Sequence, residues 1–211
     1  MTTSTRKRGS YAVGRERRER ILEVAAARFA DAGYSRTSLA EIAREVGITT
    51  PGLTHHFPTK QHLLLAIVEQ RFDVTAEAAA ATEGEIDGTR TLRLLHGLTQ
   101  LFAAKPGLMG LFVLVSAEAA DPSNPAHALF QERYERTIGE ITAFFNEEAE
   151  AGFLRGNVDY RAVARECVAV SDGLQLQYVV SGERIDLVAL SRAHLERLAP
   201  TILTSGKSLT L

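Results

Sequence analysis

The sequence predicts an all-α protein with a small helix-turn-helix head and a larger helical body. Three observations predict this fold class. Apolar residues recur at helical steps of three and four along most of the chain, no alternating run bounded by tight-turn residues indicates a strand, and two short capped helices follow a longer amphipathic one near the N-terminus. The breaks between these patterns predict about nine or ten helices.

The first expected helix covers residues 15–32. Its buried stripe includes Leu22 and Phe29, and Gly33 can end it in a left-handed turn. Residues 1–14 are polar and basic, and we expect them to form a disordered tail.

The second and third expected helices are short and carry clear start signals. Ser38 and Glu41 have the spacing of a capping box, in which each side chain binds the other residue's backbone N–H. Thr49 or Thr50 caps the third helix, and Pro51 lies in its first turn, where the missing N–H costs little. Together these signals predict two short helices packed around a tight turn.

The fourth expected helix follows Thr59 and ends shortly before an acidic, glycine-containing stretch, 82–88. This stretch separates the head from the body. We therefore expect a head at 15–75, a body at 76–204 and a flexible C-terminus at 205–211. Proline and glycine breaks divide the body into five or six helices, of which five are expected at 89–104, 107–119, 125–151, 159–181 and 186–199.

The outward face of the third helix suits contact with DNA. Its side chains are short and polar, and Gly52 permits close approach, so base edges and phosphates can be reached without steric block. The alternative is an ordinary three-helix turn that binds no DNA. The candidate DNA-binding residues are Thr37, Ser38, Thr49, Thr50, Pro51, Gly52, Thr54, His55 and Lys60.

Charge is distributed unevenly along the chain. Residues 1–60 contain 11 Lys and Arg against 6 Asp and Glu, whereas residues 61–211 contain 13 against 20. The net charge of −2 therefore hides a basic head and an acidic remainder. A basic head favours a polyanion such as double-stranded DNA, although a functionless uneven surface would give the same counts.

The body carries aromatic side chains and a few polar ones on helices that can converge. Core packing accounts for most apolar residues of these helices. Polar groups among apolar neighbours need partners, however, and an apolar cavity with a few polar groups is typical of a small-molecule site. The candidate pocket residues, for an apolar or amphipathic effector, are Phe102, Phe112, Phe130, Tyr134, Ser171, Gln175 and Tyr178.

Several absences exclude other classes of protein. No apolar window reaches the roughly 18 residues of a membrane span, and the N-terminus lacks the apolar core of a secretory signal. Cys167 is the only cysteine, which excludes an internal disulfide, fits a reducing cytosol and predicts an inert core thiol. Catalytic motifs and metal-ligand spacings are missing, and the adjacent His55 and His56 do not share a helix face. We expect a cytoplasmic protein that is not an enzyme and needs no metal or cofactor.

A set of residues at fixed spacing runs through the head. It consists of Ile21, Ala25, Phe29, Gly33-Tyr34, Thr37-Ser38-Leu39, Ile42-Ala43, Val46-Gly47, Leu53, His56-Phe57-Pro58-Thr59-Lys60 and Leu63-Leu64. With this pattern, residues 15–75 resemble the DNA-binding head of the tetracycline-repressor (TetR) family. The resemblance implies a head that places its third helix in the major groove of DNA.

One position departs from the pattern of that family. The family commonly has a tyrosine, often a phosphate contact, after the leucine of its third helix, where this chain has Thr54. Pro51 also stands where glycine is usual. Thr54 and His55 are the two candidates to replace the tyrosine's contact.

The resemblance also implies a function for the whole chain. It implies a homodimeric transcription regulator, more often a repressor, that a small effector releases from a pseudo-palindromic operator. The dimer is expected through the helices at 159–181 and 186–202, the second carrying apolar residues such as Leu187, Leu190 and Leu195. An enzyme or ligand carrier with this head, and an architectural DNA binder without an effector, are the competing classes.

Overall fold

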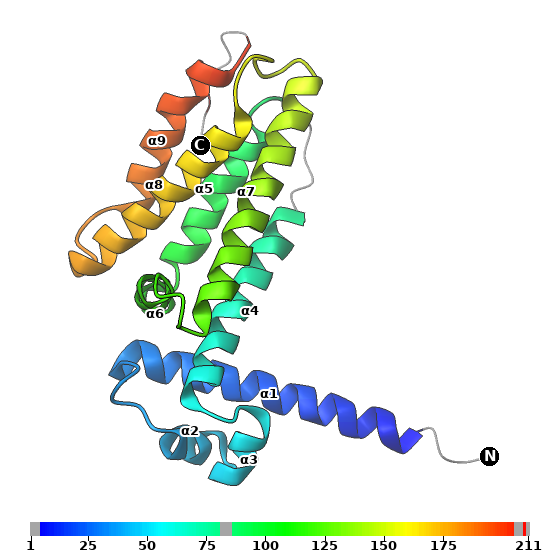
Figure 1. The fold of residues 1–211 in the computed structure, drawn as a ribbon, viewed down its shortest axis with the longest axis vertical. Helices are drawn as coiled ribbons and strands as arrows, with labels where there is room; N and C mark the ends of the chain where they lie inside the picture. Colours follow the sequence, from blue (N-terminus) through cyan, green and yellow to red (C-terminus); the bar gives the residue numbers. More distant parts are fainter. Residues whose placement is uncertain (1–4, 81–85, 205–208, 210–211) are drawn as a thin grey trace. The chain divides into compact units, whose positions relative to one another are not determined.

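The computed structural model describes residues 5–80, 86–204 and 209. Over these ranges the chain forms nine helices and no extended strand (Figure 1). The prediction of an all-α fold is therefore confirmed.

The helices belong to two compact units, Met1–Arg71 and Phe72–Leu211. The first unit contains α1 (Thr5–Ala32), α2 (Leu39–Val46), α3 (Thr50–His56) and the beginning of α4 (Lys60–Ala80). The second contains the rest of α4 and then α5 (Arg90–Ala103), α6 (Pro106–Glu118), α7 (Ala126–Glu150), α8 (Tyr160–Val180) and α9 (Leu187–Ile202). Within the described ranges, no single helix has the length and apolar composition to cross a bilayer; α5 and α6 pass that test only together, across a bend of 103°.

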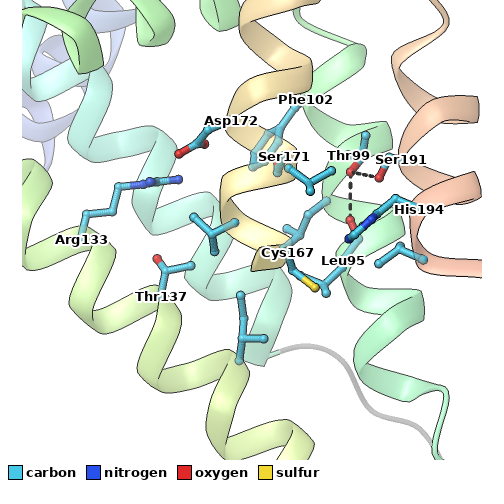
Figure 2. Close-up of a pocket in the computed structure, with 15 residues that line it drawn as sticks. Leu95, Thr99, Phe102, Arg133, Thr137, Cys167, Ser171, Asp172, Ser191 and His194 are labelled. Atoms are coloured by element: carbon cyan, nitrogen blue, oxygen red, sulfur yellow. Dashed lines mark hydrogen bonds between the residues drawn. The ribbon is translucent and has the colours of Figure 1, made fainter. Parts of the chain in front are cut away.

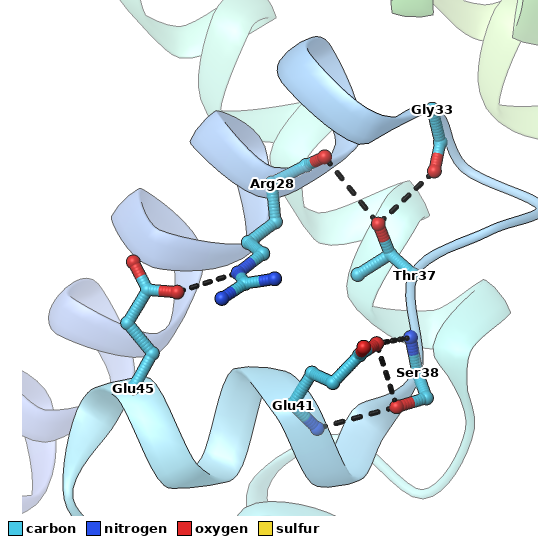
Figure 3. Close-up of polar contacts among 6 residues, drawn as sticks. All are labelled: Arg28, Gly33, Thr37, Ser38, Glu41 and Glu45. Carbon is cyan, nitrogen blue, oxygen red and sulfur yellow. Dashed lines mark hydrogen bonds and ion pairs between the residues drawn. The ribbon is translucent and has the colours of Figure 1, made fainter.

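The first unit packs the apolar faces of its helices around one core. Ile21 of α1, Ile42 of α2 and Leu53 of α3 are fully buried, with none of their surface exposed. At the surface, Arg28 of α1 pairs with Glu45 of α2 (Figure 3). This ion pair adds a polar link between two helices that the core already joins.

Helix α1 begins at Thr5, well before the start expected at residue 15. The preceding residues contain no proline, and Gly9 and Gly14 each cost a helix only about 1 kcal/mol, which weakens it without ending it. The expectation of a disordered tail is therefore not met at residues 5–14, while residues 1–4 lie outside the described part of the chain.

Both short helices of the head start with the caps expected from local sequence. The Ser38 Oγ accepts a hydrogen bond from the Glu41 N–H at 3.2 Å, and the Glu41 carboxylate accepts one from the Ser38 N–H at 2.8 Å (Figure 3). Gly47 ends α2 with a φ of +80°, a conformation that favours glycine. Of the two threonines expected to cap α3, Thr49 does so, because its Oγ1 accepts the Gly52 N–H at 3.1 Å.

The five helices expected in the body are all present, each ending within a few residues of its expected bounds. Helix α9 extends to Ile202 with Pro200 inside its last turn. Proline there removes only one hydrogen bond, so the helix can continue past the end expected at residue 199.

The second unit is built around α8, which packs against α6, α7 and α9, while α5 packs against α9. One buried cluster fills the interior, formed by Leu92, Ile138, Ile141, Phe145, Leu154, Tyr160, Ala164, Cys167, Leu195, Ala199, Ile202 and Leu203. Leu187 and Leu195 of α9 are 3% and 2% exposed, so they face their own core and cannot contact a second copy as expected. Leu190 remains 43% exposed.

A buried carboxylate holds the start of α5. Glu148 of α7 has none of its surface exposed; its Oε1 accepts the Arg90 N–H at 3.0 Å and its Oε2 accepts the Thr91 hydroxyl at 2.6 Å. Thr89 occupies the N-cap position, but its side chain makes no cap hydrogen bond. A residue from a distant helix therefore caps α5.

Candidate DNA-binding surface and ligand pocket

Helix α3 presents a polar, accessible face. Thr50, Pro51 and His55 are exposed and Thr54 is half-buried, whereas Leu53 is fully buried and anchors the opposite face. The Thr54 hydroxyl donates to the Pro51 carbonyl at 3.2 Å, which keeps its oxygen available as an acceptor. The helix thus offers hydroxyl and imidazole groups that its own unit does not cover.

Ser38 and Thr37, both expected at the DNA surface, have different environments. Ser38 is exposed at the start of α2, where it forms the capping box. Thr37 is only 3% exposed, and its hydroxyl lies within hydrogen-bond reach of the Gly33 carbonyl at 3.0 Å and the Arg28 carbonyl at 3.3 Å (Figure 3). The last carbonyls of a helix lack partners within the helix, and Thr37 supplies one. Its side chain is therefore not available to DNA, contrary to expectation.

Lys60, expected to contact the DNA backbone, is engaged within the head. Its Nζ donates to the Tyr34 carbonyl at 2.9 Å and to the Thr37 carbonyl at 3.0 Å, and it lies 4.4 Å from the centroid of the Tyr34 ring. An ammonium group has three N–H donors, and at least two of them bind carbonyl groups in the turn between α1 and α2. Lys60 fixes the backbone that leads into Ser38.

Basic side chains of α1 flank the C-terminal end of α3. Arg17 and Arg18 are exposed, and the Arg18 guanidinium lies 5.1 Å from the centroid of the Phe57 ring. Burial lowers the pKa of His56, and the charges of His55, Arg17 and Arg18 lower it further. His56 is half-buried and His55 is exposed, as expected of adjacent residues that do not share a helix face.

The second unit contains a pocket lined by α5, α7, α8 and α9 (Figure 2). Its free volume is about 60 Å³, well below the roughly 300–1,000 Å³ of typical small-molecule sites, so binding of an effector requires the surrounding helices to move apart. Its walls are mostly apolar. The lining residues are Leu95, Leu98, Thr99, Phe102, Arg133, Thr137, Ile141, Cys167, Val168, Val170, Ser171, Asp172, Ser191, His194 and Leu195.

Two polar clusters interrupt these apolar walls. On the α5–α9 side, the hydroxyls of Thr99 and Ser191 are 3.0 Å apart and hydrogen-bonded (Figure 2). The neighbouring His194 has a buried Nε2 that finds no hydrogen-bond partner among the described residues. Burial, and secondarily Arg197, lower the pKa of His194, which favours its neutral form.

On the α7–α8 side, Arg133 reaches toward Asp172 (Figure 2). Arg133 is 8% exposed, and its Cζ lies 4.8 Å from the centroid of the Phe112 ring and 5.3 Å from that of Tyr134. Asp172 accepts a hydrogen bond from the Tyr134 hydroxyl at 2.7 Å. Burial, the charge of Asp172 and this hydrogen bond raise the pKa of Tyr134. The tyrosine therefore stays protonated and acts as a donor.

The candidate pocket residues do not all meet in one place. Phe102 and Ser171 line the pocket. Phe112 and Phe130 pack against each other, with ring centroids 5.4 Å apart, outside the lining. Tyr134 lies behind the lining, where it orients Asp172.

Gln175 and Tyr178 also lie outside the lining. Gln175 is 3% exposed and its Nε2 donates to the Ser171 hydroxyl oxygen at 3.0 Å, so it supports a lining residue. Tyr178 lies two turns beyond Ser171, near the end of α8, and it forms a hydrogen bond with Glu183. Helical position alone could not show that the pocket ends before this turn.

Of the polar residues that line the pocket, sequence reasoning found Ser171 and missed Thr99, Arg133, Thr137, Asp172, Ser191 and His194. Arg133 and Thr137 of α7 follow Phe130 at steps of three and seven, which places them on the same buried face. That spacing was the available signal. Ser191 and His194 of α9 follow the buried Leu187 at steps of four and seven, so the same kind of spacing places them on a buried face, although it does not show that α5 packs there.

Cys167 also lies in the pocket wall. Burial, with a smaller contribution from Glu166, raises the pKa of its thiol to about 12. The thiol is therefore protonated at neutral pH; its burial confirms the predicted core position, and its inertness stays a prediction. Among the described residues, no group of three His, Cys, Asp or Glu side chains could hold a metal ion.

Two family models match the chain. One, described as "Bacterial regulatory proteins, tetR family", matches residues 21–67. The other, described as "BetI-type transcriptional repressor, C-terminal", matches residues 89–200, more than half of the chain. The first match covers the helix-turn-helix and the second covers the pocket.

Individual proteins resemble this chain in sequence or in structure. The nucleoid occlusion factor SlmA of Haemophilus influenzae is 27% identical over 181 residues, which cover 82% of this chain and 79% of that protein. A TetR transcription regulator of Haloarcula marismortui superposes with a TM-score of 0.78 at 21% identity, over 90% of this chain and 99% of that chain. A transcriptional regulator of Saccharomonospora viridis, solved in complex with choline, superposes with a TM-score of 0.71 at 26% identity, over 90% and 99%.

A capped helix-turn-helix beside basic side chains, in a chain that continues as an all-α body, defines a DNA-binding transcription regulator and not an enzyme. The chain belongs to the TetR family of transcriptional regulators. Regulators of this family bind DNA operators, form dimers and bind small-molecule effectors.

Proposed function

We propose that this protein is a homodimeric transcriptional repressor that leaves its operator when a small effector enters the pocket of the second unit. The single observation that carries the DNA-binding part is the exposed polar face of α3 opposite a fully buried Leu53. A repressor is supported by the description of the matching C-terminal family model. Since its target is chromosomal DNA, the protein acts in the cytoplasm.

The residues proposed to read base edges are Thr50 and His55, because both are exposed on α3. Ser38, Thr49, Pro51, Gly52 and Thr54 flank them and are proposed to lie against the phosphate backbone. Thr54 or His55 replaces the tyrosine contact of the family. Lys60 serves this surface indirectly, since it holds the turn that leads into Ser38.

The dimer is proposed to form through α8 and α9. Leu176 and Val180 of α8 are 49% and 76% exposed, and Leu190 of α9 is 43% exposed. Large apolar side chains gathered on two long helices are typical of a surface that another subunit covers. Gly173 of α8 has open space around it, which permits close approach of a second helix.

The pocket is proposed to bind the effector. It combines apolar walls with a small number of polar groups, which is the composition of small-molecule sites. Effector binding must favour a state of low operator affinity, and couplings of this kind are typically about 1–3 kcal/mol.

Binding of the purified protein to DNA fragments that flank its own gene tests this function. Fluorescence anisotropy compares such a fragment with random DNA of the same length. Thr50→Ala and His55→Ala should weaken binding to the flanking fragment by roughly tenfold or more while changing random-DNA affinity little, because base contacts carry the sequence preference.

Gln61→Ala is the matched control, since Gln61 is exposed at the start of α4 and belongs to no proposed contact. It should leave both affinities within about twofold. Equal losses on flanking and random DNA for Thr50→Ala and His55→Ala would contradict base reading by α3.

A further inference from the structure

One wall of the pocket is backed by groups of a kind that commonly binds a cation. The rings of Phe112 and Tyr134 lie behind the lining, and the carboxylate of Asp172 belongs to it. Aromatic faces together with an acidic group are the usual means of holding a quaternary ammonium ion. In this chain, however, the place of the cation is already filled.

Arg133 fills it from within the chain. Its guanidinium carbon lies 4.8 Å and 5.3 Å from the centroids of the Phe112 and Tyr134 rings, both within the distance of a cation–π contact. It reaches toward Asp172, whose charge stabilises it (Figure 2). Arginine does not lose its proton in proteins, so this positive charge is permanent. A ligand cation would meet a like charge and would find the rings covered.

The remaining groups suit an acidic ligand. A guanidinium offers donors in a planar fork that matches the two oxygens of a carboxylate. Thr137 lies one turn along α7 from Arg133 and also lines the pocket. The Ser171 oxygen accepts a hydrogen bond from Gln175, which leaves the Ser171 O–H as a donor. These donors lie beside apolar walls that include Phe102 and Leu95.

We propose that the effector of this pocket carries a carboxylate on a small apolar body, that Arg133 binds the carboxylate, and that quaternary ammonium compounds are excluded because Arg133 occupies their position. The inference rests on the proposed effector role of the pocket. Asp172 balances the single charge of Arg133, so the preference for a carboxylate rests on the planar fork of guanidinium donors and on the hydroxyl groups of Thr137 and Ser171, and not on net charge. A small apolar body follows from the free volume of about 60 Å³.

Three compounds that share one trimethyl group test the proposal: pivalate, neopentyl alcohol and choline, which are anionic, neutral and cationic. Each is titrated calorimetrically into the full-length protein. Pivalate should bind roughly tenfold or more tightly than neopentyl alcohol, as a charge-assisted hydrogen bond adds about that factor. Choline should give no heat at the same concentrations.

Variants of Arg133 then test whether this residue binds pivalate and excludes choline. Arg133→Met should lower pivalate affinity by about tenfold or more and should allow choline to bind, because the rings and Asp172 become accessible. Arg133→Lys keeps the positive charge but removes the planar pair of guanidinium donors. It should therefore lower the affinity for pivalate and still exclude choline. Arg136→Met is the matched control, since Arg136 is an exposed cation on the same helix, and it should change neither affinity beyond about twofold.

Asp172→Asn keeps the shape of the site and removes the like charge, so it should strengthen pivalate binding. Circular dichroism and a melting curve show whether Arg133→Met folds. If it does not, the pivalate affinity of Asp172→Asn still tests the proposal. Binding of choline to the wild-type protein as tightly as pivalate, unchanged pivalate affinity in a folded Arg133→Met, or no binding of any of the three compounds at millimolar concentration overturns the proposal.

Operator binding measured on the same preparations separates this proposal from the proposed function. If the wild-type protein retains specific operator affinity while pivalate fails to bind, only the assignment of effector chemistry is wrong. If specific operator affinity is itself absent, the proposed function fails whatever the pocket binds.

Discussion

The starts of α2 and α5 are capped by the same chemistry but from different distances along the chain. At α2, Ser38 and Glu41 are three residues apart and satisfy each other's backbone N–H groups. At α5, the first N–H is satisfied by Glu148, 58 residues further along. The difference teaches that the head is specified by local sequence, whereas the body is specified by contacts that exist only once its helices have packed.

Removal of Glu148 should give the largest effect. Glu148→Ala leaves the part-buried Arg90 N–H and the buried Thr91 hydroxyl without their acceptor and opens a cavity at a fully buried side chain. We expect the free energy of unfolding to fall by about 3–5 kcal/mol, since both losses add. Chemical denaturation followed by circular dichroism measures it.

Glu132→Ala is the matched control for that substitution, because Glu132 is exposed on the same helix. It should change the free energy of unfolding by less than about 0.5 kcal/mol. A loss at Glu148→Ala no larger than that of the control would show that water or a local group caps α5 equally well, and the contrast between the two helix starts would disappear.

Removal of the local cap should have a smaller effect on stability. Ser38→Ala removes one acceptor at an exposed helix start, where water can replace it, so we expect a loss of about 1 kcal/mol. The denaturation midpoint of the head measures this loss. Ser35→Ala is the control, because Ser35 is exposed and contributes only its backbone carbonyl, to Lys60. Equal midpoints for the two variants would mean that the capping box contributes nothing to stability.

The same contrast explains what could be predicted from sequence. The start of α2 and the end at Gly47 follow from residues adjacent in the chain, and so do the inward Leu53 and outward His55. Each depends on helical periodicity or on a cap, which a single sequence displays. The major exception in the head is Lys60, whose length lets it reach back to the Tyr34 carbonyl.

The pocket could be predicted only in part. Phe102 and Ser171 were within reach of sequence reasoning because aromatic and polar residues on converging helices suggest a site. Arg133 was not, because a charged residue within a helix is usually solvated and its burial here depends on the rings of Phe112 and Tyr134. Tyr178 was wrongly placed with them, since a helical face continues past the end of any pocket.

Histidines buried in the body should make its stability depend weakly on pH. His96 of α5 is 8% exposed, and burial, with the charge of Arg192, lowers its pKa below the ordinary 6.5, which Glu196 only partly offsets. The folded protein therefore binds fewer protons than the unfolded chain as the pH falls below about 6.5, so folding is favoured above that value and weakened below it. The expected loss is less than about 1 kcal/mol per histidine at about pH 6.

Melting curves between about pH 8 and pH 5.5 measure this dependence. His96→Gln should flatten the decline in melting temperature, because glutamine is polar and does not titrate. His62→Gln, at an exposed site on α4, should leave the decline as it is in the wild-type protein. A decline of the same steepness in His96→Gln would locate the proton uptake elsewhere, and His194, whose pKa is also lowered by burial, would be the next residue to replace.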